Sequence, residues 1–382
     1  MASRRAVVVD RSGLDQLIGL LRARGYATRG PVVRDGAVVP GDVASSADLP
    51  VGHHDAQAPG RYSLEGPAEA DSAGRNDELF GWAVGPASWK ADVFPPVQTV
   101  WRAQLSDGRP VVREEPDGAA PVAVVGARPC EVAALSVLDT VLADGPVADP
   151  TYARRRWAAF VVTAECGAPA ATCFCSSMTT GPAASGGFDL ALTEIRRGDG
   201  NRYLVRSGSS EGAEVLGGLT GFATPSEGDW AARSEVSAGA GRAMTRRLDT
   251  AGLPDVLARN QDHPRWAAVG ERCLSCGNCT LVCPTCFCTS VEDTTTLYGE
   301  VTRTRRWASC FELDHSYLHG GSVRTSPSSR YRQWLTHKLS TWVDQFGASG
   351  CVGCGRCITW CPVGIDLTEE AAAIRASDGA QP

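Results

Sequence analysis

Eight cysteines in the last third of the chain form two runs with identical internal spacing. Each run reads C-x2-C-x2-C-x3-C and is followed directly by a proline. Four thiolates this close together suit a compact, thiophilic core, and this run is the typical ligand pattern of 4Fe-4S clusters. The spacing therefore predicts two 4Fe-4S clusters and one-electron chemistry. The two runs are Cys273, Cys276, Cys279 and Cys283, and Cys351, Cys354, Cys357 and Cys361.

We expect the two runs to exchange ligands. In ferredoxins with two clusters, the fourth cysteine of each run binds the cluster of the other run. Gly277 and Gly355 follow the second cysteine of each run, where a residue without Cβ lets backbone N–H groups turn toward the sulfurs. The expected ligands are Cys273, Cys276, Cys279 and Cys361 for the first cluster, and Cys351, Cys354, Cys357 and Cys283 for the second.

A zinc ribbon and a disulfide framework are the alternatives to clusters. Zinc ribbons usually pair two C-x2-C knuckles and leave the third cysteine and the Cys-Pro step unexplained. Disulfides need an oxidising compartment, and the chain begins MASRRAVVVDRSG, without the apolar stretch of a signal peptide. Fifteen cysteines then favour metal ligation in a reducing cytoplasm, and we expect a cytoplasmic protein.

Charge and hydropathy narrow the set of partners. The formal net charge is −6, which leaves no basic surface for nucleic acid or anionic lipid. No apolar window is long enough to span a bilayer, so we expect no membrane contact of the chain's own. No complete G-x-G-x-x-G, G-x-x-x-x-G-K-[ST], H-E-x-x-H or G-x-S-x-G motif occurs. We therefore expect electron transfer without catalytic residues in this chain.

Four cysteines outside the two runs form a candidate third 4Fe-4S site. Each lies on an expected loop or turn, and α/β sheets place their sites where loops converge at the ends of adjacent strands. Buried or free thiols explain these residues equally well, and zinc or redox disulfide chemistry is a further alternative. The four are Cys130, Cys166, Cys173 and Cys175.

Three cysteines then remain, Cys286, Cys288 and Cys310, with His315 as a candidate fourth ligand. Small buried thiols are the favoured interpretation of these three, because free cysteine readily serves as a small buried hydrophobe. Their roles stay open at this point.

The elements that must position these cysteines fall into two regions. Apolar runs and helical spacing predict a mixed α/β domain over residues 1–225, including a strand, turn and helix over 122–142. Residues 226–240, rich in Ser, Ala, Gly and Glu, read as a linker. A ferredoxin-like dicluster domain is expected over 241–382, with a long helical insert at 284–350. The fold class is thus α+β or α/β followed by this dicluster domain.

The insert contains a helix with an apolar stripe ahead of the second run. The favoured interpretation is that the stripe packs over the cluster core, and a docking face for a partner subunit is the alternative. The stripe consists of Tyr331, Trp334, Leu335, Leu339, Trp342, Val343 and Phe346.

Four segments together resemble one family. They are CLSCGNCTLVCPTCFC at 273–288, GCVGCGRCITWCPVGID at 350–366, GARPCE at 126–131 and CFCSSMTTGP at 173–182. The chain resembles the beta subunit of soluble NAD(P)-linked nickel-iron hydrogenases, also called sulfhydrogenases, which are related to the anaerobic sulfite reductase A subunit. The resemblance extends over nearly the whole chain.

The resemblance implies a cytoplasmic heterotetramer. In it, this chain would relay electrons through 4Fe-4S clusters between a flavin- and NAD(P)-binding diaphorase subunit and the hydrogenase small subunit, while the large subunit carries the nickel-iron centre. It also implies that the eight cysteines of the two runs are ligands. Cys130, Cys166, Cys173 and Cys175 match the N-terminal cysteine pattern of the family. The alternatives are the electron-input subunit of an anaerobic sulfite reductase and a stand-alone ferredoxin-like carrier.

Overall fold

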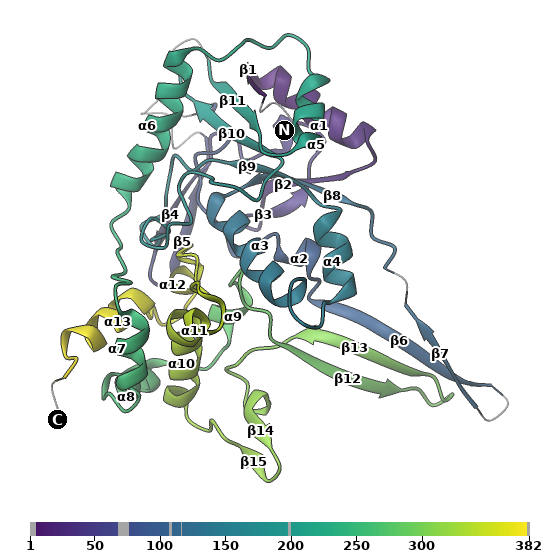
Figure 1. Cartoon of the computed structure of the whole chain (residues 1–382), viewed down its shortest axis with the longest axis vertical. Helices are drawn as coiled ribbons and strands as arrows, with labels where there is room; N and C mark the ends of the chain where they lie inside the picture. The colour runs from purple at the N-terminus through teal and green to yellow at the C-terminus, as the bar shows by residue number, and fades with distance from the viewer. Residues whose placement is uncertain (1–4, 68–75, 107–108, 116, 198–199, 380–382) are drawn as a thin grey trace.

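The computed structural model describes residues 5–67, 76–106, 109–115, 117–197 and 200–379. A seven-stranded sheet organises the N-terminal part, in the order β1-β11-β10-β9-β8-β2-β3 (Figure 1). Its four central strands β10, β9, β8 and β2 are parallel, and antiparallel strands flank them on both sides. The strands are β1 (Ala6–Val9), β2 (Ala27–Arg34), β3 (Ala37–Asp42), β8 (Val122–Ala127), β9 (Phe160–Ala164), β10 (Leu190–Ile195) and β11 (Arg202–Ser207). The expected mixed α/β fold is confirmed.

Alternate residues of the central strands face two separate cores. Ala123 and Val125 of β8 belong to a core that includes α1 and α5, whereas Val124 belongs to a core that includes α3 and α4. Both faces of the sheet are therefore covered, as a parallel sheet requires. The helices are α1 (Arg11–Ala23), α3 (Pro129–Leu142), α4 (Pro150–Trp157) and α5 (Ser210–Gly217).

Residues 227–240 of the expected linker form most of helix α6 (Glu227–Ala243), and Ser226 is the N-cap of that helix. Ser226 caps the helix, since its hydroxyl accepts a hydrogen bond from Asp229 N at 3.2 Å. Ala, Glu and Arg supply helix propensity, so the Gly residues are tolerated. In Figure 1, α6 leads from the sheet down toward the C-terminal helices.

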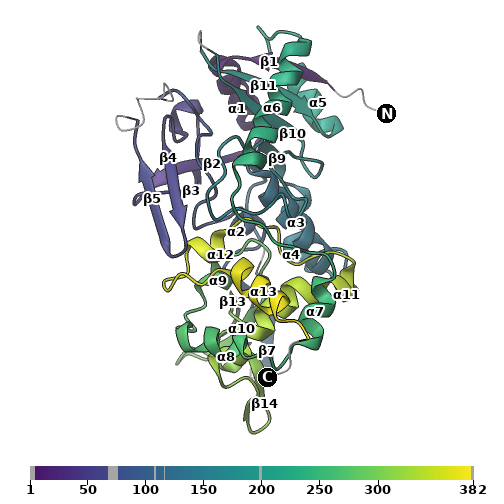
Figure 2. The ribbon, with the colours of Figure 1, turned by 90° about the vertical axis from the view of Figure 1, so that its left-hand side faces the viewer.

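The C-terminal part is mostly helical. Figure 2 shows its helices stacked beyond one end of the seven-stranded sheet. The last residues of the stripe helix continue through a π-helical segment, His337–Thr341. The helices are α7 (Leu253–Arg259), α8 (Arg265–Arg272), α9 (Asn278–Leu281), α10 (Pro327–Thr336), α11 (Trp342–Phe346), α12 (Arg356–Thr359) and α13 (Leu367–Ala376).

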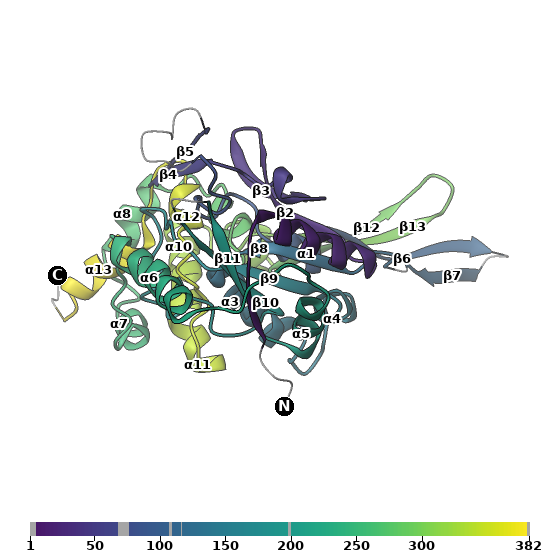
Figure 3. The ribbon, with the colours of Figure 1, turned by 90° about the horizontal axis from the view of Figure 1, so that it is seen from above.

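The insert at 284–350 contains the expected helix in its second half, and its first half adds strands that the sequence pattern did not predict. Its first half forms a hairpin that joins an N-terminal hairpin in a four-stranded antiparallel sheet, β12-β13-β6-β7. Figure 3 shows this sheet projecting from the body. Its strands are β6 (Val97–Ser106), β7 (Arg109–Glu114), β12 (Thr289–Thr295) and β13 (Val301–Trp307).

Short elements complete the fold. Gly60, at the turn of the β4–β5 hairpin, donates a backbone hydrogen bond to Ile358 O at 3.1 Å and so contacts the second cysteine run. Among the described residues, no helix has the length and apolar character to cross a membrane. The short elements are β4 (His54–Ala58), β5 (Arg61–Glu65), α2 (Lys90–Val93), β14 (Tyr317–Leu318), β15 (Gly321–Ser322) and 3-10 turns at Ser46–Asp48 and Asp314–Ser316.

Candidate metal centre

The two cysteine runs form loops with matching backbone conformations. Ser275 and Gly353, each two residues after the first cysteine of its run, have φ of 52° and 65°. Their N–H groups donate to Cys273 Sγ and Cys351 Sγ, both at 3.4 Å. Gly277 and Gly355 also have positive φ, 75° and 76°, and each directly precedes a short helix, α9 or α12. The expectation that N–H groups turn toward the sulfurs in these loops is met.

Two cavities beside these loops collect the cysteines in crossed sets. Each cavity is bordered by the first three cysteines of one run and the fourth cysteine of the other. Cys357 borders both cavities and therefore lies between them. This arrangement supports the cross-tied ligand assignment. The first cavity is lined by Cys273, Cys276, Cys279 and Cys361, and the second by Cys351, Cys354, Cys357 and Cys283.

The surroundings of the thiols fit iron-sulfur cores. Phe311, Tyr331 and Trp334 line the first cavity, and the same aromatic side chains belong to the hydrophobic core of the C-terminal part. The stripe helix thus packs over the cysteines, as the favoured interpretation predicts. Burial raises the pKa of the Cys279 and Cys357 thiols, so they bind a core only with release of their protons. A cluster bound here would supply one-electron chemistry, and the aromatic side chains around the cavity would shield that cluster from water.

A buried lysine lies beside the second cavity. Lys338, in the π-helical segment, donates from Nζ to Cys283 Sγ at 3.3 Å and to Thr285 Oγ1 at 2.9 Å. A hydrogen bond from the Cys286 thiol and the charge of Lys338 hold the pKa of Cys283 well below its usual range. Single-turn π-helical segments often mark functional positions. Lys338 is therefore placed to tune the second cluster through its charge.

We expect Lys338→Met to lower the midpoint potential of one cluster, because the positive charge favours the more negative reduced state. At an effective dielectric constant of about 20, a unit charge near 4 Å from its partner contributes about 4 kcal/mol, which corresponds to about 170 mV for one electron, and we expect a shift of tens of millivolts. A redox titration followed by paramagnetic resonance measures it. Lys338→Arg, which keeps the charge, is the control. Equal potentials in the Met variant and the wild type would exclude the tuning role.

The four N-terminal cysteines converge next to the second cavity. Cys130 is the second residue of α3, just after β8, and Cys166 follows β9, so both lie at the carboxyl ends of neighbouring parallel strands, as predicted. Burial first, and then the neighbouring thiols of Cys175 and Cys354, raise the pKa of Cys130. Burial and the neighbouring thiol of Cys166 likewise raise the pKa of Cys173. The candidate third set, Cys130, Cys166, Cys173 and Cys175, is thus buried and gathered beside Cys354.

Close backbone packing joins this third set to the second loop. Phe174 N donates to Gly353 O at 2.9 Å, and the Cys173 thiol donates to Cys354 O at 3.7 Å. A Cβ on Gly355 would lie 2.4 Å from Thr172 O, so only glycine permits this approach. The third set and the second cavity are consequently parts of one continuous region.

A buried ion pair crosses the same boundary. Arg356 of α12 lies between two cysteines of the second run, and its Nη2 is 2.5 Å from Glu131 Oε1, next to Cys130. Arg356 also donates to Gly85 O at 2.8 Å. Removing one partner of a buried ion pair strongly destabilises the folded state, because the other charge is left buried without compensation. The pair therefore fixes α12 against the start of α3.

The chain's sequence pattern did not point to Lys90, Lys338 and Arg356 as functional residues. A weak signal existed for Lys338, which falls within the apolar stripe between Leu335 and Leu339. His315, the candidate fourth ligand for the remaining cysteines, lies on a 3-10 turn, where burial and Arg324 lower its pKa.

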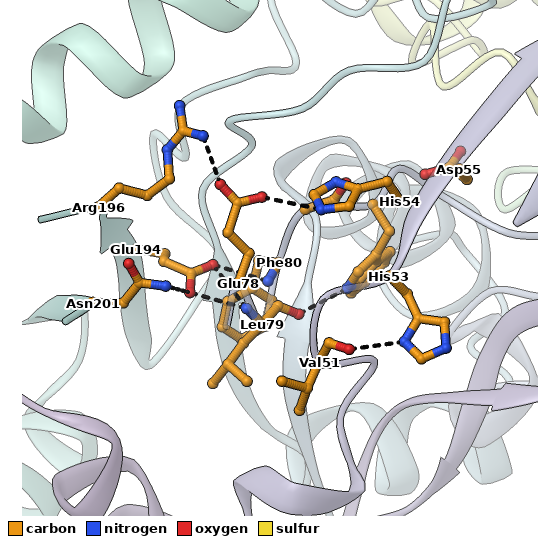
Figure 4. A network of polar contacts seen from close by, with 12 residues as sticks. Val51, His53, His54, Asp55, Glu78, Leu79, Phe80, Glu194, Arg196 and Asn201 are labelled. Carbon is orange, nitrogen blue, oxygen red and sulfur yellow. Dashed lines mark hydrogen bonds and ion pairs between the residues drawn. The ribbon is translucent and has the colours of Figure 1, made fainter. Parts of the chain in front are cut away.

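A separate polar network lies near the end of β10 (Figure 4). Glu194 accepts hydrogen bonds from Leu79 N and Phe80 N, both at 2.9 Å, and from Asn201 Nδ2 at 3.2 Å. Beside it, Glu78 contacts His54 and Arg196. Burial outweighs these hydrogen bonds and raises the pKa of Glu194 to about 7.

The raised pKa of Glu194 predicts a pH-dependent stability. The native state binds this proton more tightly than the unfolded chain, so the contribution is complete below the ordinary pKa of 4.5 and is lost as the pH rises through about 7. We expect the free energy of unfolding to fall by about 3 kcal/mol over this range. Chemical denaturation from pH 5 to 8 measures the slope. If the free energy of unfolding of the Glu194→Gln variant depends on pH in the same way, another group causes the dependence.

The geometry defines an iron-sulfur electron-transfer subunit that holds two 4Fe-4S clusters, and a family model described as a 4Fe-4S dicluster domain matches residues 272–365. Over 263 residues the chain is 36% identical to sulfhydrogenase 2 subunit beta of Pyrococcus furiosus. The aligned region covers 68% of this chain and 76% of that protein. The chain belongs to the family of sulfhydrogenase beta subunits. No solved structure matches it.

Proposed function

We propose that this chain relays electrons, within a cytoplasmic heterotetramer, between a flavin- and NAD(P)-binding diaphorase subunit and the small subunit of a nickel-iron hydrogenase. The large subunit of that complex would carry the nickel-iron centre. The relative named sulfhydrogenase 2 subunit beta supports a hydrogenase complex as the setting. The chain itself contributes clusters and the path between them.

The observation that carries the proposal is the continuity of three thiol sets. Cys357 borders both cavities, and Cys354 lines the second cavity while neighbouring Cys130 and Cys175. Clusters in these three places would form a series that runs from the helical C-terminal part to the carboxyl ends of the sheet strands. Such a series suits a relay, because each cluster accepts one electron at a time whereas a flavin exchanges two.

The third set is part of the proposal. Four buried thiols without a metal would remain protonated, since burial raises the pKa of Cys166 and raises that of Cys175 to about 12. A third 4Fe-4S core on Cys130, Cys166, Cys173 and Cys175 explains why they converge next to a ligand of the second cluster. Buried thiols without metal are the competing interpretation, and Ser replacement of all four with no loss of iron would favour it.

Purification of the native complex tests the proposed setting. We expect a co-purifying subunit with nickel ligands, and reduction of the clusters of this chain by NADH or NADPH only when the diaphorase subunit is present. Paramagnetic resonance after rapid freezing follows this reduction. A sirohaem absorption band in the complex would favour the sulfite reductase alternative. A lone species of 40 kDa in gel filtration would favour a stand-alone carrier.

A further inference from the structure

Three neighbouring side chains of helix α10 each carry a buried donor group that has no hydrogen-bond partner among the described residues. The donors are Arg330 Nε, Tyr331 Oη and Trp334 Nε1. All three side chains are less than a tenth exposed. Buried polar groups in native proteins nearly always have a partner. Donors of this kind on one helix therefore indicate that an acceptor from outside the polypeptide completes them.

The Tyr331 hydroxyl lies near thiols of both cysteine runs. Tyr331 lines the first cavity together with Cys279 and Cys357. Burial raises the pKa of Tyr331 well above its usual range, and the charges of Glu370, Cys357 and Cys279 add to this rise. The Glu370 carboxylate is held by two arginines and accepts no hydrogen bond from Tyr331. The sulfur atoms of the first cluster are the acceptors that remain for this hydroxyl.

Trp334 borders both cavities, and its indole nitrogen can only donate. Its ring centroid lies 5.4 Å from that of Tyr331 and 6.2 Å from that of Phe311. Rings packed in this way are fixed by the density of the core. Neither donor can turn to another partner without disturbing that packing.

Arg330 reaches the first cysteine loop through Ser275. Its Nη2 donates to Ser275 Oγ at 3.0 Å. Its Nη1 donates to Arg324 O at 3.2 Å and to Thr325 O at 3.1 Å. These partners are neutral, and no acidic side chain in the described part of the chain pairs with the guanidinium. A buried cation is costly unless a negative charge compensates it, and the first cluster with its thiolates would supply that charge.

Ser275 has a backbone conformation that favours glycine, with φ of 52°. The equivalent residue of the second loop is indeed a glycine, Gly353. The Ser275 N–H donates to Cys273 Sγ, and the Ser275 hydroxyl accepts from Arg330. Burial raises the pKa of the Cys273 thiol, and hydrogen bonds from the backbone and the hydroxyl of Ser275 oppose this rise. A serine in this strained conformation indicates that its hydroxyl has a function in the first loop.

We propose that helix α10 sets the midpoint potential of the first cluster. Tyr331 donates a hydrogen bond to a sulfur atom of this cluster. Arg330 is a positioning residue, which holds the Ser275 hydroxyl at Cys273 and adds a buried positive charge. Hydrogen-bond donors and positive charge both stabilise the more negative reduced state, so both raise the potential.

The tuning role depends on Cys273 as a ligand of the first cluster, and it does not depend on the relay. The potential of a cluster is measured in the full-length chain without any partner subunit. A failed relay in the complex would leave this potential unchanged. An unchanged potential in the variants would leave the relay intact.

The first test removes a single oxygen atom. Tyr331→Phe keeps the ring and its packing, and it is compared with the wild type in a redox titration followed by paramagnetic resonance. The component that Cys273→Ser removes identifies the first cluster. At the potential that half-reduces the wild-type cluster, we expect the ratio of reduced to oxidised first cluster to fall about fivefold.

Tyr317→Phe is the matched control, because it makes the same change in a solvent-exposed tyrosine of β14. It should leave the potential of the first cluster unchanged. Equal potentials in Tyr331→Phe and the wild type would overturn the direct hydrogen bond.

The second test separates the charge from the serine hydroxyl. Arg330→Gln removes the charge and keeps a donor, and we expect the same ratio to fall about tenfold, which is about 59 mV for one electron. Arg330→Lys should restore most of the potential. Ser275→Gly gives the first loop the residue of the second, keeps the N–H and loses the hydroxyl, so the ratio should fall about threefold. Arg332→Gln, on the same helix, is the control and should change neither cluster.

A general loss of packing would move the potentials of both clusters together. An equal shift of both clusters in Arg330→Gln, or an unchanged first cluster, would therefore overturn the role of Arg330. Ser275→Gly decides the matter if Arg330→Gln does not retain its clusters, because glycine suits the positive φ of this position. An unchanged first-cluster potential in Ser275→Gly would then refute the proposal.

Discussion

Replacing Cys357 by Ser should abolish electron relay through the chain while the diaphorase partner continues to reduce dyes directly. Cys357 borders both cavities, so the variant damages the second cluster at the point where the two clusters approach each other. A missing member of a series interrupts every path through it. We expect hydrogen-dependent reduction of NAD or NADP in the assembled complex to fall at least about a hundredfold, equivalent to roughly 3 kcal/mol.

The control for this experiment is Ile358→Val in the same short helix, which changes packing without touching a thiol. Ile358 is fully buried, so the control reports how far a local packing defect alone affects relay. It should retain most of the activity. Undiminished pyridine nucleotide reduction by the Cys357→Ser complex would refute the relay.

Single Ser substitutions should sort the eight cysteines into two spectroscopic groups that cross the sequence. Cys361→Ser should perturb the same resonance component as Cys273→Ser, and Cys283→Ser the same component as Cys351→Ser. The reason is that Cys361 lines the cavity of the first run, and Cys283 lines that of the second. We expect each substitution to abolish or convert the whole resonance signal of one cluster.

Spectra recorded on all four variants under the same reductant decide the grouping. If each cluster used only its own run, Cys361→Ser would instead group with Cys351→Ser. Thr359→Ser, two residues before Cys361, is a suitable control, since its hydroxyl hydrogen bond to Gln57 Oε1 at 2.8 Å can be retained. That variant should leave both components unchanged.

The cysteine spacing was sufficient to predict the clusters, because cluster ligation depends on short, regular intervals that are visible in one dimension. The central strands were also predictable, since a parallel strand covered on both faces is a continuous apolar run such as Val122–Ala127. Strand β2 escaped prediction because it contains Gly30 and Pro31, residues typical of turns.

Features that depend on tertiary contacts could not be read from the chain. Helix α6 has few buried residues, so its Ser- and Gly-containing sequence lacks the apolar periodicity that predicts a helix. Strand β12 is almost fully exposed along its length and is ordered by pairing with β13. Lys90 approaches Cys286 across 196 positions of sequence, a distance that no local pattern encodes.

The four-stranded sheet also limits how the chain can be divided. Strand β6 pairs with β13 over residues 97–103 and 301–306, so a fragment that stops within α6 would leave that edge without its partner. Unpaired strand edges invite association with other chains, and Val97, Val100 and Leu105 of β6 are already solvent-exposed. Truncation at α6 should therefore yield an aggregating N-terminal piece, and limited proteolysis there would release insoluble material rather than two independent halves.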